Sequence, residues 1–237
     1  MRCDLAKLKY SRMHKSQGMP LVKEVVNGMK VEYRKLRDGD KHGLYQEWDE
    51  NGQLRKQRNY VNGRKDGLLE QWHENGKLEM RYKYLNDSEH GVAEQWYENG
   101  QLKLKCNYVD GRKDGIFEQR YETGEDLEKC NYVNGVMEGI CEQWHENGED
   151  LEKCNYVNGR QHGVYVQWYE NGQLRLKVNY VDGLENGVAE EWHENGQLRL
   201  KCNYGGGAMN GVFQQWDEDG QLKLKCNYVN GVQIKSN

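Results

Sequence analysis

The chain has 237 residues, of which only 36% are hydrophobic, and its mean hydropathy is −1.11. A chain this polar cannot build the deep core of an ordinary globular domain of its length. Tyr occurs 16 times and Trp 7 times but Phe only twice, so the apolar surface comes mainly from rings with a polar edge. A single proline and 11% aromatic residues are unlike a disordered chain. The net charge of −4 gives no attraction to nucleic-acid phosphates, so we expect no nucleic-acid partner.

Residues 1–18 are a basic N-terminal segment without the hydrophobic core of a signal peptide. We expect a flexible tail, and the alternative is a short amphipathic contact with a partner or a membrane through Leu5, Leu8, Tyr10 and Met13. The chain contains no run of 18 apolar residues that would cross a membrane as a helix. We therefore expect a cytoplasmic protein.

Residues 19–42 read as a degenerate capping repeat, because Asn27-Gly28 and Asp38-Gly39 keep the phase of later pairs. Residues 43–235 then form eight copies of a 24-residue repeat. One ladder of the repeat is tryptophan, at Trp48, Trp72, Trp96, Trp144, Trp168, Trp192 and Trp216, with Arg120 in the remaining copy. A second ladder is tyrosine, at Tyr60, Tyr84, Tyr108, Tyr132, Tyr156, Tyr180, Tyr204 and Tyr228.

Between each Trp and Tyr lies a hairpin signal, usually Glu-Asn-Gly. A two-residue Asn99-Gly100 loop would place Trp96 opposite Lys103, whereas a three-residue loop from Glu98, with Gly100 in the left-handed conformation, places it opposite Leu102. We predict the second. It sets Glu94 opposite Leu104 and Val92 opposite Cys106, so that one face carries Val92, Trp96, Leu102, Leu104, Cys106 and Tyr108. The other face would carry Ala93, Gln95, Tyr97, Lys103, Lys105 and Asn107.

One hairpin cannot bury enough surface to stand alone, so neighbours must stack edge to edge. The predicted fold is therefore all-β: an elongated, single-layer antiparallel ribbon of β-hairpin repeats, open like a solenoid. The fourth repeat departs from the pattern, because Arg120 replaces Trp and Leu127 is shifted by one position. We expect an exposed ion pair of Arg120 with Asp126, and our hypothesis is that this repeat is the weakest link and a bend.

Five cysteines share one position of the repeat: Cys106, Cys130, Cys154, Cys202 and Cys226. Equivalent residues two strands apart lie about 9.5 Å from each other, beyond the Cα separation that a disulfide can span. Val178 fills the same position, which indicates a small buried apolar site. We therefore expect reduced thiols in a reducing compartment.

The repeat resembles the MORN-type family, in the variant form of an antitoxin-like MORN repeat family, through Gly91, Trp96, Glu98-Asn99-Gly100-Gln101-Leu102, Asn107-Tyr108 and Gly111. Similar arrays occur in large DNA viruses of amoebae, which would place the protein in the host cytoplasm or the virion. The resemblance covers about residues 19 to 235 and implies a ribbon used for protein contacts, self-association or placement near membranes. The regular Tyr-x-Gly start of the better-known repeat is absent, so lipid binding is not carried over.

The tryptophan ladder could be a stacking platform for sugars or bases, but a Trp paired with Leu is more typical of the stripe that joins repeats. The position after each Trp varies, which suits either a solvated or a recognition surface; its candidate members are Tyr97, Tyr121, Tyr169, His73, His145 and His193. These histidines are two or three repeats apart, too far to share a metal, so we expect no metal and no cofactor.

No catalytic motif is present, and a uniform repeat offers no unique pocket, so we predict a protein that is not an enzyme. The expected function is a scaffold that binds a protein partner or forms a homo-oligomer through open sheet edges. Two alternatives stay open: a toxin-neutralising binding protein and a peripheral membrane tether.

Overall fold

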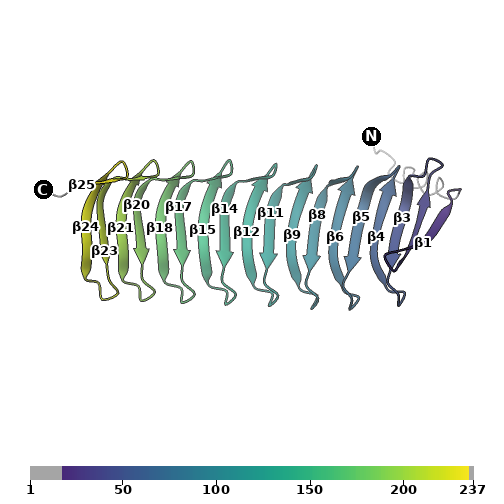
Figure 1. Cartoon of the computed structure of the whole chain (residues 1–237), viewed down its shortest axis with the longest axis horizontal. Coiled ribbons are helices and arrows are strands. Elements are labelled where there is room, and N and C mark those ends of the chain that lie inside the picture. The colour runs from purple at the N-terminus through teal and green to yellow at the C-terminus, as the bar shows by residue number, and fades with distance from the viewer. Residues whose placement is uncertain (1–17, 235–237) are drawn as a thin grey trace, which may run out of the picture. The chain divides into compact units, whose positions relative to one another are not determined.

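The computed structural model describes residues 18–234, and these form antiparallel strands without a helix. The predicted class is confirmed, since hairpins recur about every 24 residues. The chain divides into two compact units, residues 1–112 and 113–237. Figure 1 labels most of the longer strands of the two units. Residues 1–17, which include most of the predicted basic segment, lie outside the described residues.

The first unit is a sheet in which strands that are consecutive in the chain pair antiparallel, except that residues 88–89 and 91–96 both pair with the strand of residues 78–85. Its strands are β1 (Leu21–Val26), β2 (Met29–Lys35), β3 (Lys41–Trp48), β4 (Leu54–Val61), β5 (Arg64–Trp72), β6 (Leu78–Leu85), β7 (Ser88–Glu89), β8 (Gly91–Trp96) and β9 (Leu102–Val109). The two-residue strand β10 (Arg112–Lys113) contains the boundary between the units.

The second unit repeats one pattern, in which a two-residue strand and a six-residue strand both pair with the preceding long strand. Its strands are β11 (Gly115–Arg120), β12 (Asp126–Val133), β13 (Val136–Met137), β14 (Gly139–Trp144), β15 (Asp150–Val157), β16 (Arg160–Gln161), β17 (Gly163–Trp168) and β18 (Leu174–Val181). They continue as β19 (Leu184–Glu185), β20 (Gly187–Trp192), β21 (Leu198–Gly205), β22 (Ala208–Met209), β23 (Gly211–Trp216), β24 (Leu222–Val229) and β25 (Val232–Ile234).

The loops that contain Glu-Asn-Gly are three residues long, as predicted. Tyr97 N donates to Gln101 O and Gly100 N donates to Tyr97 O, both at 2.9 Å. Gly100 has a φ of 93°, whereas Asn99 does not have a positive φ. This is a type I turn followed by a left-handed glycine, and it brings Trp96 opposite Leu102.

The loops at the other end of the strands have two residues, both with positive φ. Asp110 and Gly111 have φ values of 49° and 78°, which is the type I′ geometry that matches the twist of a hairpin. Each of these loops also bonds to the preceding repeat: Gly111 N donates to Glu89 O, and Gly159 N donates to Met137 O. Neighbouring repeats are therefore joined by backbone bonds beyond the strand ladders.

The predicted faces are wrong for half of each hairpin. Trp96 is opposite Leu102, but Gln95 is opposite Leu104, so Lys103 is an extra residue at a β-bulge. Because one inserted residue reverses the alternation, Ala93 lies opposite Cys106 and Val92 lies opposite Asn107. The predicted pairs of Glu94 with Leu104 and of Val92 with Cys106 do not form. The same bulge recurs in every hairpin from β3–β4 to β23–β24.

The hairpin of β1 and β2 differs from the later repeats in its loop geometry. Its loop is the two-residue pair Asn27-Gly28, with both φ values positive and Val26 opposite Met29. The next loop, Leu36 to Asp40, has the bonds of a three-residue loop, because Gly39 N donates to Leu36 O and Leu36 N to Asp40 O. From its place in the 24-residue repeat, the loop at Asn27-Gly28 should have three residues and the loop at Asp38-Gly39 two. The structure shows the reverse.

Replacing Gly148 by alanine should lower stability by about 1–2 kcal/mol, because its φ of 86° is unfavourable for an L-residue. A steric clash is not the reason, since the atom nearest to an added Cβ is Glu125 Oε2 at 3.8 Å. Urea unfolding followed by tryptophan fluorescence measures the change. The control is Gly205→Ala in strand β21, where φ is not left-handed and stability should stay equal or rise. Equal losses in both variants would contradict the assignment.

Candidate functional site

One face of each sheet holds the buried residues, and we call it the cysteine face. It carries the shared cysteine position, the residue opposite it on the neighbouring strand, and the tyrosine two residues later. In the second unit its buried members are Phe117, Cys130, Cys141, Cys154, Val178, Ala189, Cys202 and Cys226. A ring faces a small residue in some hairpins, since Phe117 is opposite Cys130 and Tyr165 is opposite Val178, whereas two small residues face each other in others, as Ala189 does Cys202.

The tyrosine ladder packs against the aromatic members of this face. Phe117 and Tyr132 meet edge to face with ring centres 6.1 Å apart, and Tyr165 and Tyr180 do so at 6.2 Å. Such contacts add about 0.5–1.5 kcal/mol each beyond their buried area. The tyrosines therefore contribute to the packing of the cysteine face, and a structural role for the whole ladder stays a prediction.

The predicted recognition residues directly precede the three-residue loops and contact the next repeat. Tyr121 OH donates to Trp144 O at 2.9 Å, and Tyr169 OH donates to Trp192 O at 2.8 Å. The histidines contact the same carbonyl: His73 Nε2 lies 2.9 Å from Trp96 O, His145 Nε2 3.4 Å from Trp168 O, and His193 Nε2 3.1 Å from Trp216 O. Tyr97 also has an interaction partner. This placement favours a structural role, and recognition by these residues stays a prediction.

The asparagine of each three-residue loop is bonded in two directions. Asn171 Oδ1 accepts a hydrogen bond from Gln173 N in its own loop, and Asn171 Nδ2 donates to Glu194 O of the next loop at 3.0 Å. Asn75, Asn147 and Asn195 donate in the same way to the carbonyls of Glu98, Glu170 and Glu218. Sequence reasoning missed this ladder, although the regular Asn was its signal.

The opposite face of each sheet, which we call the ion-pair face, exposes a row of aliphatic side chains beside a row of charges. The aliphatic residue follows each repeat glycine and is 44% to 53% exposed; its members are Leu44, Leu68 and Val92 in the first unit and Ile116, Ile140, Val164, Val188 and Val212 in the second. Beside it, Glu190 pairs with Lys201 at 2.8 Å and Glu118 with Lys129 at 3.6 Å. The reversed alternation after the bulge puts these aliphatic residues in solvent.

The fourth repeat has the predicted ion pair, since Arg120 Nε lies 3.0 Å from Asp126 Oδ1. Arg120 and Asp126 also line a shallow depression of about 370 Å³ with Trp144. Leu127 stands at the bulge, unpaired, and Glu128 takes the cysteine-face position that Leu104 has in its repeat. That this repeat is the weakest link stays a prediction.

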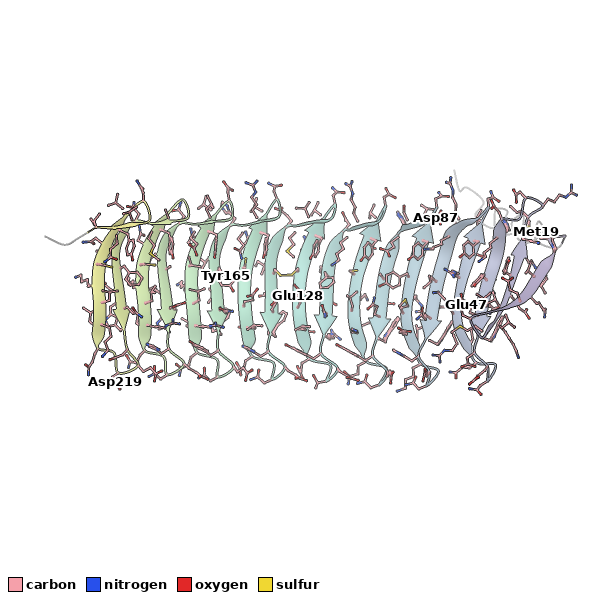
Figure 2. The ribbon with its side chains drawn as sticks, in the orientation of Figure 1. Met19, Glu47, Asp87, Glu128, Tyr165 and Asp219 are labelled. Atoms are coloured by element: carbon pink, nitrogen blue, oxygen red, sulfur yellow. A yellow bond between two sulfur atoms is a disulfide. The ribbon has the colours of Figure 1, made fainter. Side chains whose placement is uncertain are left out.

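The expectation that all thiols are reduced is wrong for one pair. Cys130 of β12 and Cys141 of β14 form a disulfide, with Cα atoms 4.2 Å apart. Figure 2 shows this bond beside Glu128. The sequence argument compared equivalent cysteines two strands apart and did not test Cys141, which lies on the strand between Cys130 and Cys154. Cys154 is opposite Cys141 on the other side and is a buried thiol, and burial raises its pKa.

One group in the described part of the chain has metal-ligand geometry. The ligand atoms of Glu128, Cys130 and Cys141 all lie within 4.8 Å of one another. The sequence search for a metal site considered the histidines, which share no such group in residues 18–234. It missed this cluster because the three residues meet only through the pairing of two repeats.

The family model for the MORN repeat variant matches seven segments: residues 41–62, 65–86, 89–110, 137–158, 161–182, 185–204 and 209–230. Together they cover more than half of the chain. The chain belongs to the MORN repeat variant family. The segment between the third and fourth matches contains Arg120, so the divergent MORN repeat is also the one that the family model leaves out. No curated protein matches the chain.

The part of this MORN repeat chain that the structure describes contains no helix with the length and apolar character needed to span a membrane.

Replacing Asn171 by aspartate should cost about 1 kcal/mol of stability, because the acceptor for Gln173 N remains while the donor to Glu194 O is lost. The matched control is Asp219→Asn, the reverse change at the equivalent position, where Asp219 forms no such bond to a later loop among the described residues. Chemical unfolding measures both, and amide exchange of residues 194–197 should rise only in the first. An equal effect of the two changes would contradict the inter-repeat bond.

Stability should fall above about pH 10, because burial raises the pKa of several tyrosines on the cysteine face. Burial, with Glu47 beside the ring, raises the pKa of Tyr45 from 10.0 to about 12, and burial also raises the pKa of Tyr165 and Tyr204. The folded chain keeps protons that the unfolded chain has lost, so stability is full below pH 10 and decreases as pH rises toward 12. Urea midpoints at increasing pH measure the decrease, and Tyr45→Phe should make it shallower. A midpoint that does not change over this range would refute the prediction.

Proposed function

We propose that the chain is a non-enzymatic scaffold that binds a protein partner across the ion-pair face. The observation that supports this proposal is the exposed aliphatic row. Leu, Ile and Val side chains remain about half exposed at the same position of repeat after repeat. Such a regular row is more than a few scattered surface residues, and exposed apolar surface commonly marks interaction sites.

The charges beside the row suit a specific partner. Glu and Lys alternate across the strands, as in the pairs Glu142–Lys153 and Glu190–Lys201. A partner with the complementary alternation would be held in register, because opposite charges across an interface contribute mainly to specificity. Neighbouring charges are held at the fixed strand spacing of about 4.8 Å.

The partner can be a different protein or a second copy of this chain, and the finer alternatives stay predictions. A homo-oligomer through open sheet edges would use β1 or β25, in which Val25 and Val232 are the most exposed hydrophobic residues. A toxin-neutralising role would use the ion-pair face. A membrane tether would use the basic segment, of which residues 1–17 lie outside the described residues.

The test is the triple variant Ile140→Asp, Val164→Asp and Val188→Asp, compared with the original chain. Affinity purification from the protein's own cells measures partner binding, and sedimentation velocity measures self-association. Binding should fall about ten-fold or more, because charges replace central apolar contacts. Circular dichroism should not change, since these side chains are exposed.

The control triple adds the same charge in the loops, with Gln173→Glu, Gln197→Glu and Gln221→Glu. Glu125 and Glu149 already occupy this loop position in other repeats, so the fold should accept the changes. The control should bind as the original chain does. An original chain that stays monomeric and recovers no partner, or an Asp triple that binds equally well, would refute the proposal.

A further inference from the structure

The Cys130–Cys141 pair sits where two repeats meet on the cysteine face. Strands β12 and β14 pair through Glu128 with Gln143 and Lys129 with Glu142, which brings Cys130 beside Cys141 at the next step. Both side chains are buried. Cross-strand neighbours with Cα atoms 4.2 Å apart can direct both sulfurs to one point, whether or not the sulfurs are bonded to each other.

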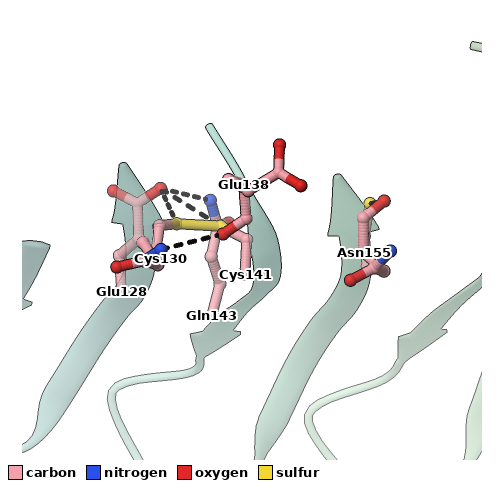
Figure 3. Close-up of a disulfide and its surroundings, with 8 residues drawn as sticks. Glu128, Cys130, Glu138, Cys141, Gln143 and Asn155 are labelled. Atoms are coloured by element: carbon pink, nitrogen blue, oxygen red, sulfur yellow. Dashed lines mark hydrogen bonds between the residues drawn. A yellow bond between two sulfur atoms is a disulfide. The ribbon is translucent and has the colours of Figure 1, made fainter. Parts of the chain in front are cut away.

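A carboxylate lies beside the two sulfurs without a cationic partner. Glu128 Oε1 is 3.4 Å from Cys130 Sγ and 3.9 Å from Cys141 Sγ, and Gln143 Nε2 donates to it at 3.3 Å. Figure 3 shows the carboxylate against the disulfide. The sulfurs of a disulfide carry no proton to donate. Among the described residues, no lysine or arginine forms an ion pair with this half-buried carboxylate.

We propose that, when the disulfide is reduced, Cys130, Cys141 and Glu128 together bind one thiophilic divalent cation of the Zn²⁺ or Cd²⁺ class. A dithiol reductant reduces the Cys130–Cys141 disulfide to two protein thiols and is itself oxidised to a disulfide. The cation then displaces one proton from each thiol and binds the two thiolates and the carboxylate. Oxidation closes the site again, so the same two sulfurs form either a crosslink or a metal site.

The donor set selects this class of cation. Two thiolates favour Zn²⁺ and Cd²⁺ over hard cations such as Mg²⁺ and Ca²⁺, which prefer oxygen ligands. A tetrahedral zinc with Zn–S bonds of about 2.3 Å places its two sulfurs about 3.8 Å apart. The three ligand atoms lie within 4.8 Å of one another, and reduction of the bridge frees the two sulfurs to separate to the distance that zinc requires by rotation of their side chains. Three protein ligands leave one tetrahedral position open.

The equivalent glutamate and cysteine one repeat later already have hydrogen-bond partners. Cys141 is also opposite Cys154, and Glu152 has the position of Glu128 one repeat later. Glu152, however, accepts a hydrogen bond from Tyr165 OH at 2.7 Å, and the sulfur of Cys154 contacts Asn155 O at 3.6 Å. The site therefore belongs to Cys130 and Cys141, and Cys154 serves as a control.

The experiment is a titration of the full chain with Cd²⁺ after reduction by a phosphine, followed by the ultraviolet thiolate-to-cadmium absorption. The reduced chain should bind one Cd²⁺ with high affinity, and Zn²⁺ should compete for it. The oxidised chain should bind none at this site. A reduced chain without a stoichiometric Cd²⁺ band would overturn the proposal.

The variants use residues that other repeats already accept at the same positions. Cys141→Ala copies Ala93 and Ala189 and should abolish the band, and Glu128→Leu copies Leu104 and should weaken binding by about 10- to 100-fold. Cys154→Ser and Cys202→Ser are the controls and should bind as the original chain does. Binding that survives in Cys141→Ala, or that disappears in Cys154→Ser, would show that the cation is held by other thiols and would overturn the assignment.

Discussion

The hydrogen bonds that join each hairpin to the next are the constraint on which the structure of each unit depends. One sheet has no second layer to cover it, so a side chain is buried only if the strands on both sides are present. The loops add to these bonds: Asn171 reaches the Glu194 carbonyl and Tyr169 reaches the Trp192 carbonyl. The repeat must then keep a constant length, because one inserted residue would break the ladder and both sets of loop contacts.

This constraint explains which positions vary. Residues that contact a backbone carbonyl need only a donor of the right reach, so either His or Tyr can follow Trp and make the same contact. Residues on the cysteine face need a volume that fits their neighbours, and the residue opposite a Cys or Val is either an aromatic ring or another small side chain. Aliphatic residues on the ion-pair face have neither requirement. Their regular presence there is what points to a binding role.

The sequence predicted what is local in the chain. Asn-Gly signals and their spacing predicted the strands, the three-residue loops, the Trp96–Leu102 pair and the Arg120–Asp126 ion pair. The faces were predicted wrongly because the bulge at Lys103 depends on the twist of the paired strands, and strict alternation does not reveal it. Cys130 and Cys141 were missed as a pair for a related reason: they belong to different repeats, and only the register between repeats brings them together.

Two repeats of this chain share the same sequence change, but the residues beside it differ, and so does the resulting chemistry. The shift of leucine by one residue occurs twice, and each time it places a glutamate on the cysteine face, at Glu128 and at Glu152. Glu152 pairs with Gln167 across the strands, and Tyr165 lies diagonally from it and donates its hydroxyl to the carboxylate. The equivalent of Tyr165 beside Glu128 is Cys141, so the same change produces a carboxylate hydrogen-bonded to a tyrosine in one repeat and a carboxylate beside two sulfurs in the other. A repeat array can thus acquire a single reactive site without giving up its period, because two substitutions in adjacent repeats are enough.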